Sequence, residues 1–275
     1  MSWRHPEITD AIRRALAEDV GPGDITTEAC VPPGARAEGL FLARQPLVVA
    51  GVELLGEIYD QLGGVDRIEV LHPSGDEVRA DEPVARVQGP TRTLLTAERT
   101  ALNFLQRLSG VATVARRFVR AVEGTGCRVL DTRKTTPGLR RLEKLAVAAG
   151  GATNHRLGLY DAVLIKNNHI AAAGGVRRAL ERAAASGKPV QIEVRTRQEL
   201  VEALACGASH LLLDNLPPAE VAEAVRFIAG RAKVEVSGGV TLDSVRAYAE
   251  TGADFVSAGA LTHSAPAVDL SFRIL

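Results

Sequence analysis

The sequence has little cysteine, no net charge and no long apolar run. Its three cysteines, Cys30, Cys127 and Cys206, stand far apart and follow no metal-ligand spacing. Because a sparse, odd set of cysteines is typical of a reducing cytosol, we expect a cytoplasmic protein. The first residues contain no apolar segment, so we expect no secretory signal. No uncharged apolar run approaches the roughly 18 residues that span a bilayer, and we expect no membrane segment.

Charge excludes two further classes of protein. The chain has 33 Lys and Arg against 33 Asp and Glu, so we expect neither a nucleic-acid-binding nor a membrane-surface protein. Lysine is scarce, at five residues against 28 arginines, yet Lys134, Lys144 and Lys166 fall within one short stretch. Where arginine is the usual cation, a retained lysine can act as a compact point charge, although chance is the simpler reading for any one of them.

The first third of the chain predicts a small α+β module. Apolar spacing predicts helices over 7–19 and 52–62 and a longer helix over 92–108, whose polar stripe includes Arg99. Short β-like runs separated by Gly and Pro turns predict strands over the following ranges: 36–44, 47–50, 66–71 and 83–88.

From about residue 126 the chain alternates regularly between apolar runs and helical segments. The six runs are Arg128–Arg133, Ala162–Lys166, Val190–Val194, His210–Asn215, Lys233–Ser237 and Phe255–Gly259. The helical segments between them are 139–149, 170–186, 197–206, 217–230 and 241–251. This alternation predicts parallel βαβ units, either as a barrel or as a doubly wound sheet.

Two features favour the barrel. No GxGxxG motif follows the first strand, as a dinucleotide-binding sheet would require. Functional-looking residues also recur where each predicted strand ends, which is where a barrel builds its active site. These residues are Arg133, Lys166, Glu193, Asp214, Ser237 and Gly259.

Basic residues are concentrated in one stretch of this otherwise neutral chain. Residues 127–169 contain eight Lys and Arg against three acids, which predicts a polyanionic ligand. A solvated helix face is the alternative, and it is the better reading of four residues at helical spacing: Arg140, Arg141, Glu143 and Lys144. It is the poorer reading of Arg133, Lys134, Arg156 and Lys166, which lie at strand ends or in a loop.

Acids and glycines follow the later strands. Glu193 and Asp214 end successive strands, where they could hold Mg²⁺ or ribose hydroxyls, or simply pair with the cations. The segments Ser237-Gly238-Gly239 and Gly259-Ala260-Leu261-Thr262 lie between a strand and a helix. Such loops expose backbone N–H groups, and loops after the last barrel strands often bind phosphate. Ordinary tight turns are the alternative.

Taken together, these motifs resemble the quinolinate phosphoribosyltransferase family over nearly the whole chain. The resemblance rests on Asp131-Thr-Arg-Lys-Thr-Thr-Pro-Gly138, Gly150-Gly-Ala-Thr-Asn-His-Arg156, Leu164-Ile-Lys-Asn-Asn-His169, Leu213-Asp-Asn215, Ser237-Gly-Gly239 and Gly259-Ala-Leu-Thr-His-Ser264. Two N-terminal segments, 18–27 and 98–103, also match. The chain departs from the family at Asn167, where an acid is frequent, and at Gln191, where glutamate is frequent.

The resemblance implies an α/β protein with an N-terminal α/β sandwich domain over 1–108 and an open TIM-like α/β barrel over 109–275, whose last residues could return to the first domain. It implies a decarboxylating pentosyltransferase of NAD biosynthesis, which converts quinolinate and phosphoribosyl diphosphate to nicotinate mononucleotide, CO₂ and diphosphate with Mg²⁺. It also implies a homodimer or higher oligomer in which Arg99 completes the partner's site.

The resemblance assigns roles to individual residues. Quinolinate would be held by Arg133, His155, Arg156 and Lys166, with Lys134 beside them and Arg99 from the neighbouring subunit. Glu193 and Asp214 would hold the ribose and the metal, and Lys134, Lys166, Glu193 and Asp214 are the expected catalytic residues. Phosphate would be held by Ser237, Gly238, Gly239, Gly259, Leu261, Thr262 and His263.

Two other functions are compatible with these residues. A phosphoribosyltransferase of the same fold could use nicotinate or another pyridine or azole acid, although the density of cations around Arg133 and Arg156 favours a dicarboxylate. A barrel that binds its ligand without reacting would not need both metal-type carboxylates.

Overall fold

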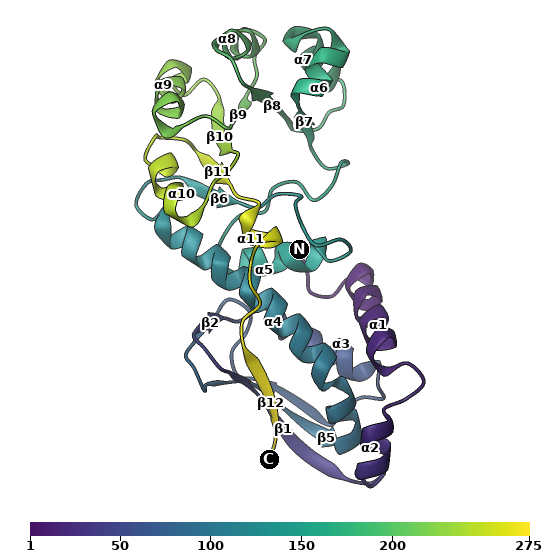
Figure 1. Ribbon diagram of the computed structural model, residues 1–275. Helices are drawn as coiled ribbons and strands as arrows, with labels where there is room; N and C mark the ends of the chain where they lie inside the picture. Colours follow the sequence, from purple (N-terminus) through teal and green to yellow (C-terminus); the bar gives the residue numbers. More distant parts are fainter. The chain divides into compact units, whose positions relative to one another are not determined.

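The computed structural model describes all 275 residues, which divide into two compact units. Unit 1 comprises Met1–Arg116, Thr135–Gly151 and Ser264–Leu275, and unit 2 comprises Arg117–Lys134 and Ala152–His263. The first contains an antiparallel sheet and the second a parallel one (Figure 1). The expected fold class, an N-terminal α/β domain with an open α/β barrel, is confirmed. No helix combines the length and the apolar character needed to cross a membrane.

Unit 1 is built on a four-stranded sheet in the order β12-β1-β5-β3. The strands are β1 (Arg36–Ala43), β3 (Arg67–Val70), β5 (Pro83–Pro90) and β12 (Leu270–Ile274), and β2 (Leu47–Val48) pairs with β4 (Glu77–Val78) separately. The helices are α1 (Pro6–Val20), α2 (Ile25–Cys30), α3 (Leu54–Asp60), α5 (Arg140–Ala149) and α4 (Thr91–Ala121), which continues into unit 2. The predicted strands are present, whereas α2, β4 and β12 were not predicted and α4 extends 13 residues beyond the predicted 108.

The last strand of the chain returns to the first strand of the sheet. In β12, Phe272 lies opposite Phe41 of β1, and their ring centroids are 4.7 Å apart. Beside them, a Cβ atom on Gly39 would lie 2.1 Å from the ring of Phe272, so only glycine leaves room for that ring. This requirement for a small residue fixes where β12 can dock on β1.

The solvated-face reading of α5 is wrong for two of its residues. Glu143 and Lys144 are both fully buried. Glu143 accepts hydrogen bonds from the Arg107 guanidinium, at 2.6 Å, and from the Thr136 backbone N–H, at 3.0 Å. A buried carboxylate is tolerated when donors surround it in this way. The charges of α5 therefore include internal ion-pair partners, which helical spacing alone cannot distinguish from surface residues.

Unit 2 is an open barrel of six parallel strands in the order β6-β11-β10-β9-β8-β7, so β6 and β7 form its two edges. The strands are β6 (Arg128–Leu130), β7 (Val163–Ile165), β8 (Val190–Val194), β9 (His210–Asp214), β10 (Lys233–Ser237) and β11 (Phe255–Ser257). Helices α6 (Asn167–Ala173), α7 (Val176–Ala184), α8 (Arg197–Ala205), α9 (Pro218–Ile228) and α10 (Leu242–Ala249) follow the strands, and α7 to α10 cover their outer side (Figure 1).

The alternation of side chains along each strand decides which residues enter the barrel. On β10, Lys233, Glu235 and Ser237 point to one face and Val234 and Val236 to the other. The register aligns Glu235 with Leu212 of β9, and Ser237 with Asp214. The inward-facing residues therefore form layers, and the layer at the carboxyl ends of the strands lies where barrel active sites are built.

Candidate active site

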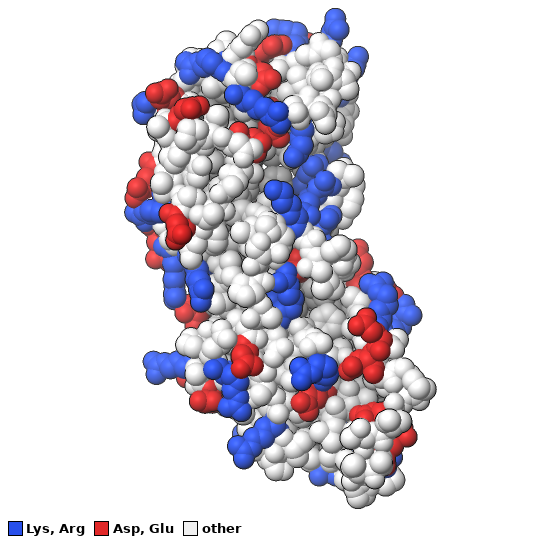
Figure 2. Space-filling view, viewed as in Figure 1, with Lys and Arg blue, Asp and Glu red and all other residues white.

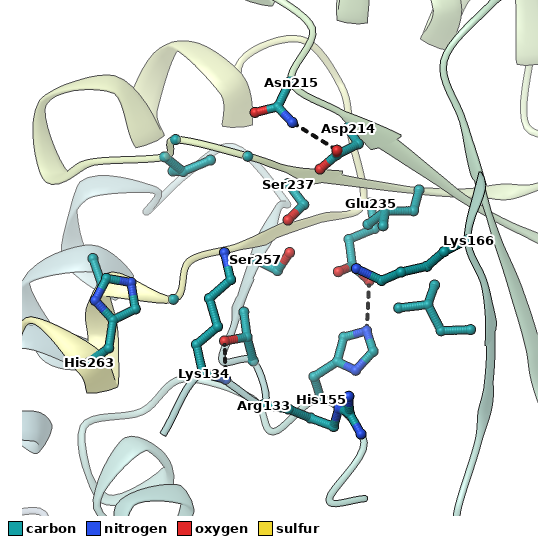
Figure 3. Close-up of a pocket in the computed structure, with 18 of the residues that line it drawn as sticks. Arg133, Lys134, His155, Lys166, Asp214, Asn215, Glu235, Ser237, Ser257 and His263 are labelled. Atoms are coloured by element: carbon teal, nitrogen blue, oxygen red, sulfur yellow. Dashed lines mark hydrogen bonds and ion pairs between the residues drawn. The ribbon is translucent and has the colours of Figure 1, made fainter. Parts of the chain in front are cut away.

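A cavity in unit 2, here called the main cavity, has a volume of about 680 Å³ and lies at the carboxyl ends of the strands. Its lining combines basic residues, one acid at a strand end and glycine-rich loops (Figure 3). Eleven of the predicted site residues line it: Arg133, Lys134, His155, Arg156, Lys166, Asp214, Ser237, Gly238, Gly239, Gly259 and His263. Such a set offers cations for anionic groups and backbone N–H groups for phosphate.

A buried carboxylate beneath the cavity holds the loop that carries two of these residues. Asp131, which follows β6, is completely buried. It accepts hydrogen bonds from the backbone N–H of His155, at 2.7 Å, and from the side-chain amide of Asn154, at 2.8 Å. These bonds fix the 154–156 segment against the end of β6. Strand β6 lies at the edge of the sheet, and its free edge is joined only by the single β-bridge between Leu130 and Thr153.

The guanidinium groups of Arg156 and Arg133 lie close enough to repel each other. Burial and then the charge of Arg133 lower the pKa of Arg156, while Asp161 raises it. Arg156 donates a hydrogen bond to the backbone carbonyl of Ala162, at 3.0 Å, which orients the group and leaves its charge intact. Two adjacent guanidinium groups repel until an anion lies between them, so this pair favours a ligand with carboxylate or phosphate groups.

The side chain of Lys134 crosses the mouth of the cavity over Gly259. A Cβ atom on Gly259 would lie 2.9 Å from the Lys134 side chain and 3.0 Å from the His263 ring, so glycine leaves space for both. Thr262 is completely buried and donates a hydrogen bond to the backbone carbonyl of Lys134, at 2.7 Å. In Figure 3 the amino group of Lys134 points into the cavity, toward Ser237 and Ser257.

Asp214 is the strand-end acid that faces the cavity, and its neighbour orients it. The side-chain amide of Asn215 donates a hydrogen bond to the Asp214 carboxylate, at 2.7 Å. Asn215 adopts a positive φ of 59°, which is uncommon for a residue with a side chain and is frequent at functional sites. A Cβ atom on Gly238 would lie 2.3 Å from the Asn215 side-chain oxygen, so Gly238 makes room for this arrangement. Sequence analysis did not assign Asn215 a role.

Glu193 does not line the main cavity. It is 3% exposed and accepts hydrogen bonds from Arg195, the shorter at 2.9 Å, while the Lys166 amino group lies 3.9 Å away. This geometry agrees with the ion-pair reading of Glu193. No group of three or more His, Cys, Asp or Glu residues is placed to hold a metal ion. Mg²⁺ usually binds one or two carboxylates together with substrate phosphates, and Asp214, which lines the main cavity, fits such a site, whereas Glu193 is paired with cations in this structure.

Three further predicted residues lie outside the lining of the cavity. Leu261 and Thr262 are completely buried beneath the loop after β11, and Thr262 acts there through its bond to Lys134. Arg99 is exposed on α4 and belongs to unit 1. The roles predicted for these residues remain predictions.

Sequence analysis missed an acid in the centre of the barrel, Glu235. It is 1% exposed, lies in the middle of β10 and lines the main cavity. Burial alone would raise the pKa of its carboxyl, but hydrogen bonds from His155 and His210, and then from Gln191, outweigh it and lower the pKa to about 2. A charged residue in the middle of an apolar strand, two positions before Ser237, was the signal that could have found it.

Charge on the surface is less segregated than in the cavity. Figure 2 shows acidic and basic side chains interspersed over most of the visible face, with Lys and Arg gathered toward the middle of its right-hand side. The neutral total of the chain is therefore compatible with a local excess of positive charge around one ligand site.

Comparison with known proteins assigns the chain to a family. The family described as quinolinate phosphoribosyl transferase matches with its N-terminal domain at residues 24–109 and its C-terminal domain at residues 111–273. The chain belongs to the quinolinate phosphoribosyltransferase family. A nicotinate-nucleotide pyrophosphorylase (carboxylating) of Mycobacterium leprae is 46% identical over 273 residues, covering 96% of each chain.

Two further relatives support the assignment to this family. A chloroplastic nicotinate-nucleotide pyrophosphorylase (carboxylating) of Arabidopsis thaliana is 39% identical over 294 residues, covering 98% of this chain and 84% of that one. The solved structure of the nicotinate-nucleotide pyrophosphorylase from Francisella tularensis is 38% identical, covers 99% of this chain and 98% of that one, and has a TM-score of 0.95. The resemblance found from the motifs is confirmed.

Proposed function

We propose that the protein transfers the phosphoribosyl group of phosphoribosyl diphosphate to quinolinate and releases CO₂, giving nicotinate mononucleotide in NAD biosynthesis. The observation that carries this proposal is the cationic main cavity in a full-length member of the quinolinate phosphoribosyltransferase family. Both substrates are multiply charged anions, so bringing them together costs Coulomb energy that Arg133, Arg156, Lys134 and Lys166 offset.

Orientation supplies most of the catalysis in this proposal. The bond from the pyridine nitrogen to the ribose C1 forms as the bond from C1 to diphosphate breaks, so the two substrates must be held in line. Arg133 and Arg156 bind the ring carboxylates through their planar forks, and Lys134 faces the departing diphosphate. Ser237 and the glycines after β10 and β11 hold the ribose phosphate through their N–H groups.

The chain's own residues need no further organic cofactor for decarboxylation. After N-ribosylation the pyridinium ring accepts the electron pair released as CO₂ leaves, and a proton then replaces CO₂ at that ring carbon. Mg²⁺ bound with the diphosphate would neutralise part of the charge of the leaving group, and Asp214 would hold it. Two other expectations stay predictions, the metal-binding role of Glu193 and the cytoplasmic location.

The reaction is tested by measuring CO₂ release and nicotinate mononucleotide formation with quinolinate and phosphoribosyl diphosphate, with and without Mg²⁺. We expect both products only when both substrates are present, and less of them without Mg²⁺. Nicotinate, a monocarboxylate, is the matched control substrate and should turn over far more slowly. Mononucleotide formed from nicotinate but not from quinolinate would instead support the monocarboxylate enzyme. Binding without turnover would support the non-catalytic barrel.

We also propose a homodimer in which Arg99 completes the site of the partner subunit. Suppose that Arg99→Ala and Lys134→Ala each abolish activity. When equal amounts are mixed, unfolded and refolded, about half of the dimers pair unlike chains and each such dimer regains one intact site, so about a quarter of the wild-type sites return. If Arg99 acts within its own chain, no activity returns. The mixed dimers are verified by mass spectrometry, and refolded wild-type protein is the control.

A further inference from the structure

Glu235 places a negative charge at the floor of a cavity that the proposed function fills with anions. The residue is 1% exposed, and it lines both the main cavity and a second cavity of about 610 Å³, whose lining includes the first residues of β8, β9 and β10. A carboxylate there opposes an anionic substrate, and burying it costs desolvation free energy. Nothing in the proposed reaction requires an acid at this depth, so its role lies in what it contacts.

Glu235 is the centre of a closed hydrogen-bonded network that joins three strands, β8, β9 and β10, to the loop that carries His155. The side-chain amide of Gln191, on β8, donates to the Glu235 carboxylate at 2.7 Å. The Nε2 atoms of His155 and His210 lie 3.4 Å and 3.5 Å from the same carboxylate. Gln191 also contacts both rings, at 3.1 Å each, with its oxygen facing His155 and its nitrogen facing His210. The link from His155 to Glu235 is drawn in Figure 3.

This network determines which nitrogen of His155 carries the proton. The backbone N–H of Arg156 donates to Nδ1 of His155 at 2.8 Å, so Nδ1 is an acceptor. In a neutral ring the proton must then lie on Nε2, where it faces the oxygen of Gln191 and the carboxylate of Glu235. Because Gln191 donates its own amide to Glu235, its oxygen is fixed toward His155. A carboxylate only accepts hydrogen bonds, so Glu235 selects this whole arrangement.

We propose that Glu235 is a positioning residue that holds His155 in its Nε2–H form and thereby fixes the His155–Arg156 side of the anion site. Asp131 already fixes the backbone of this segment through the His155 N–H. Glu235 fixes the His155 ring, and the ring in turn accepts a hydrogen bond from the backbone N–H of Arg156. His155 and Arg156 are therefore held in a defined geometry before the ligand binds. The effect on quinolinate rests on the proposed function, whereas the effect on the ring does not.

The first test reads the ring directly. In ¹⁵N-histidine-labelled wild-type protein, with the His155 signals identified by their loss in His155→Asn, we expect a protonated Nε2 and an unprotonated Nδ1 at neutral pH. In Glu235→Gln we expect the His155 signals to shift toward a mixture of tautomers, because an amide replaces the acceptor-only group. Glu223→Gln, which alters an exposed glutamate of α9, is the matched control and should leave them unchanged. A proton on Nδ1 in the wild-type protein would overturn the proposal.

The second test reads the effect on substrates. For Glu235→Gln we expect the KM for quinolinate to rise about tenfold, as for loss of one charge-assisted contact, while the KM for phosphoribosyl diphosphate changes less than about twofold. An equal rise in both, or no rise, would refute positioning of the quinolinate site. If Glu235→Gln does not fold, Gln191→Leu is the second variant, because it removes the amide that bridges His155 and Glu235 and keeps the carboxylate. We expect the same selective rise in the KM for quinolinate, and its absence would refute the positioning role. If the wild-type protein does not turn over quinolinate, the proposed function is wrong. The tautomer of His155 would still show whether Glu235 positions the ring.

Discussion

Replacing Asp131 with asparagine tests whether a buried carboxylate organises the cationic side of the main cavity. The change preserves shape but removes the charge and turns one acceptor oxygen into a donor. In the native protein both oxygens accept, from the His155 backbone N–H at 2.7 Å and from the Asn154 amide at 2.8 Å. In Asp131→Asn one of these donors faces another donor, so one bond is lost and a buried polar group is left unpaired.

The magnitude follows from these two bonds. Losing a hydrogen bond to a charged group costs roughly 1.5–3 kcal/mol, and an unpaired buried donor adds to that cost, so the free energy of unfolding should fall by about 2–4 kcal/mol. The 154–156 segment also loosens, so quinolinate should bind about tenfold more weakly. Asp243→Asn is the matched control, because Asp243 is exposed in the first turn of α10, where a charge contributes about 0.3–1 kcal/mol.

Urea unfolding measures the first quantity and calorimetric titration with quinolinate measures the second. A fall in unfolding free energy no larger than that of Asp243→Asn would show that the Asp131 bonds contribute little. Unchanged quinolinate affinity together with a large loss of stability would separate the two claims, since Asp131 would then support the fold without positioning the ligand loop.

Three other changes probe the same cavity. Arg156→Ala should weaken quinolinate binding by roughly 1.5–3 kcal/mol and phosphoribosyl diphosphate binding much less, and equal effects in calorimetry would contradict the assignment. Asp214→Asn should lower turnover and flatten its dependence on Mg²⁺ concentration, whereas wild-type turnover across a magnesium titration would show that Asp214 does not serve the metal. The pKa of Glu235 falls from an ordinary 4.5 to about 2 in the folded protein, so its stabilisation is complete above pH 4.5 and disappears as the pH falls toward 2. Glu235→Gln should therefore lose less stability than the wild-type protein as the pH falls from 4.5 toward 2, and circular dichroism measured against pH follows this loss.

The barrel could be predicted because its signals are local. Strands β8 and β10 begin and end as predicted, since apolar runs bounded by polar residues mark a buried parallel strand. Five of the six predicted strand-end residues also line the cavity, because parallel strands bring their carboxyl ends to one edge. What each strand end contacts could not be predicted in the same way, as Glu193 shows by pairing with Arg195.

The rest of the fold depends on contacts that periodicity does not encode. Helix α5 follows a barrel strand in the sequence, yet it belongs to unit 1, where Glu143 and Lys144 are buried. Strand β12 exists because Phe272 finds the space that Gly39 leaves on β1, a pairing across more than 230 residues of sequence. Both outcomes are decided by tertiary packing, which overrides the local pattern.

The buried acids explain how a neutral chain can keep a cationic site. Asp131 and Glu235 are each essentially buried, and the partners described for them are a backbone N–H, amide groups and imidazole rings. Both acids accept hydrogen bonds from the segment that carries His155, or contact its ring, and these contacts fix the geometry of the ligand loop. Arg156, in turn, directs its hydrogen bond to the carbonyl of Ala162, which orients a guanidinium without neutralising it. A neutral chain can therefore hold buried acids and a cationic ligand site within one small region, because the acids organise the loop on which the cation stands.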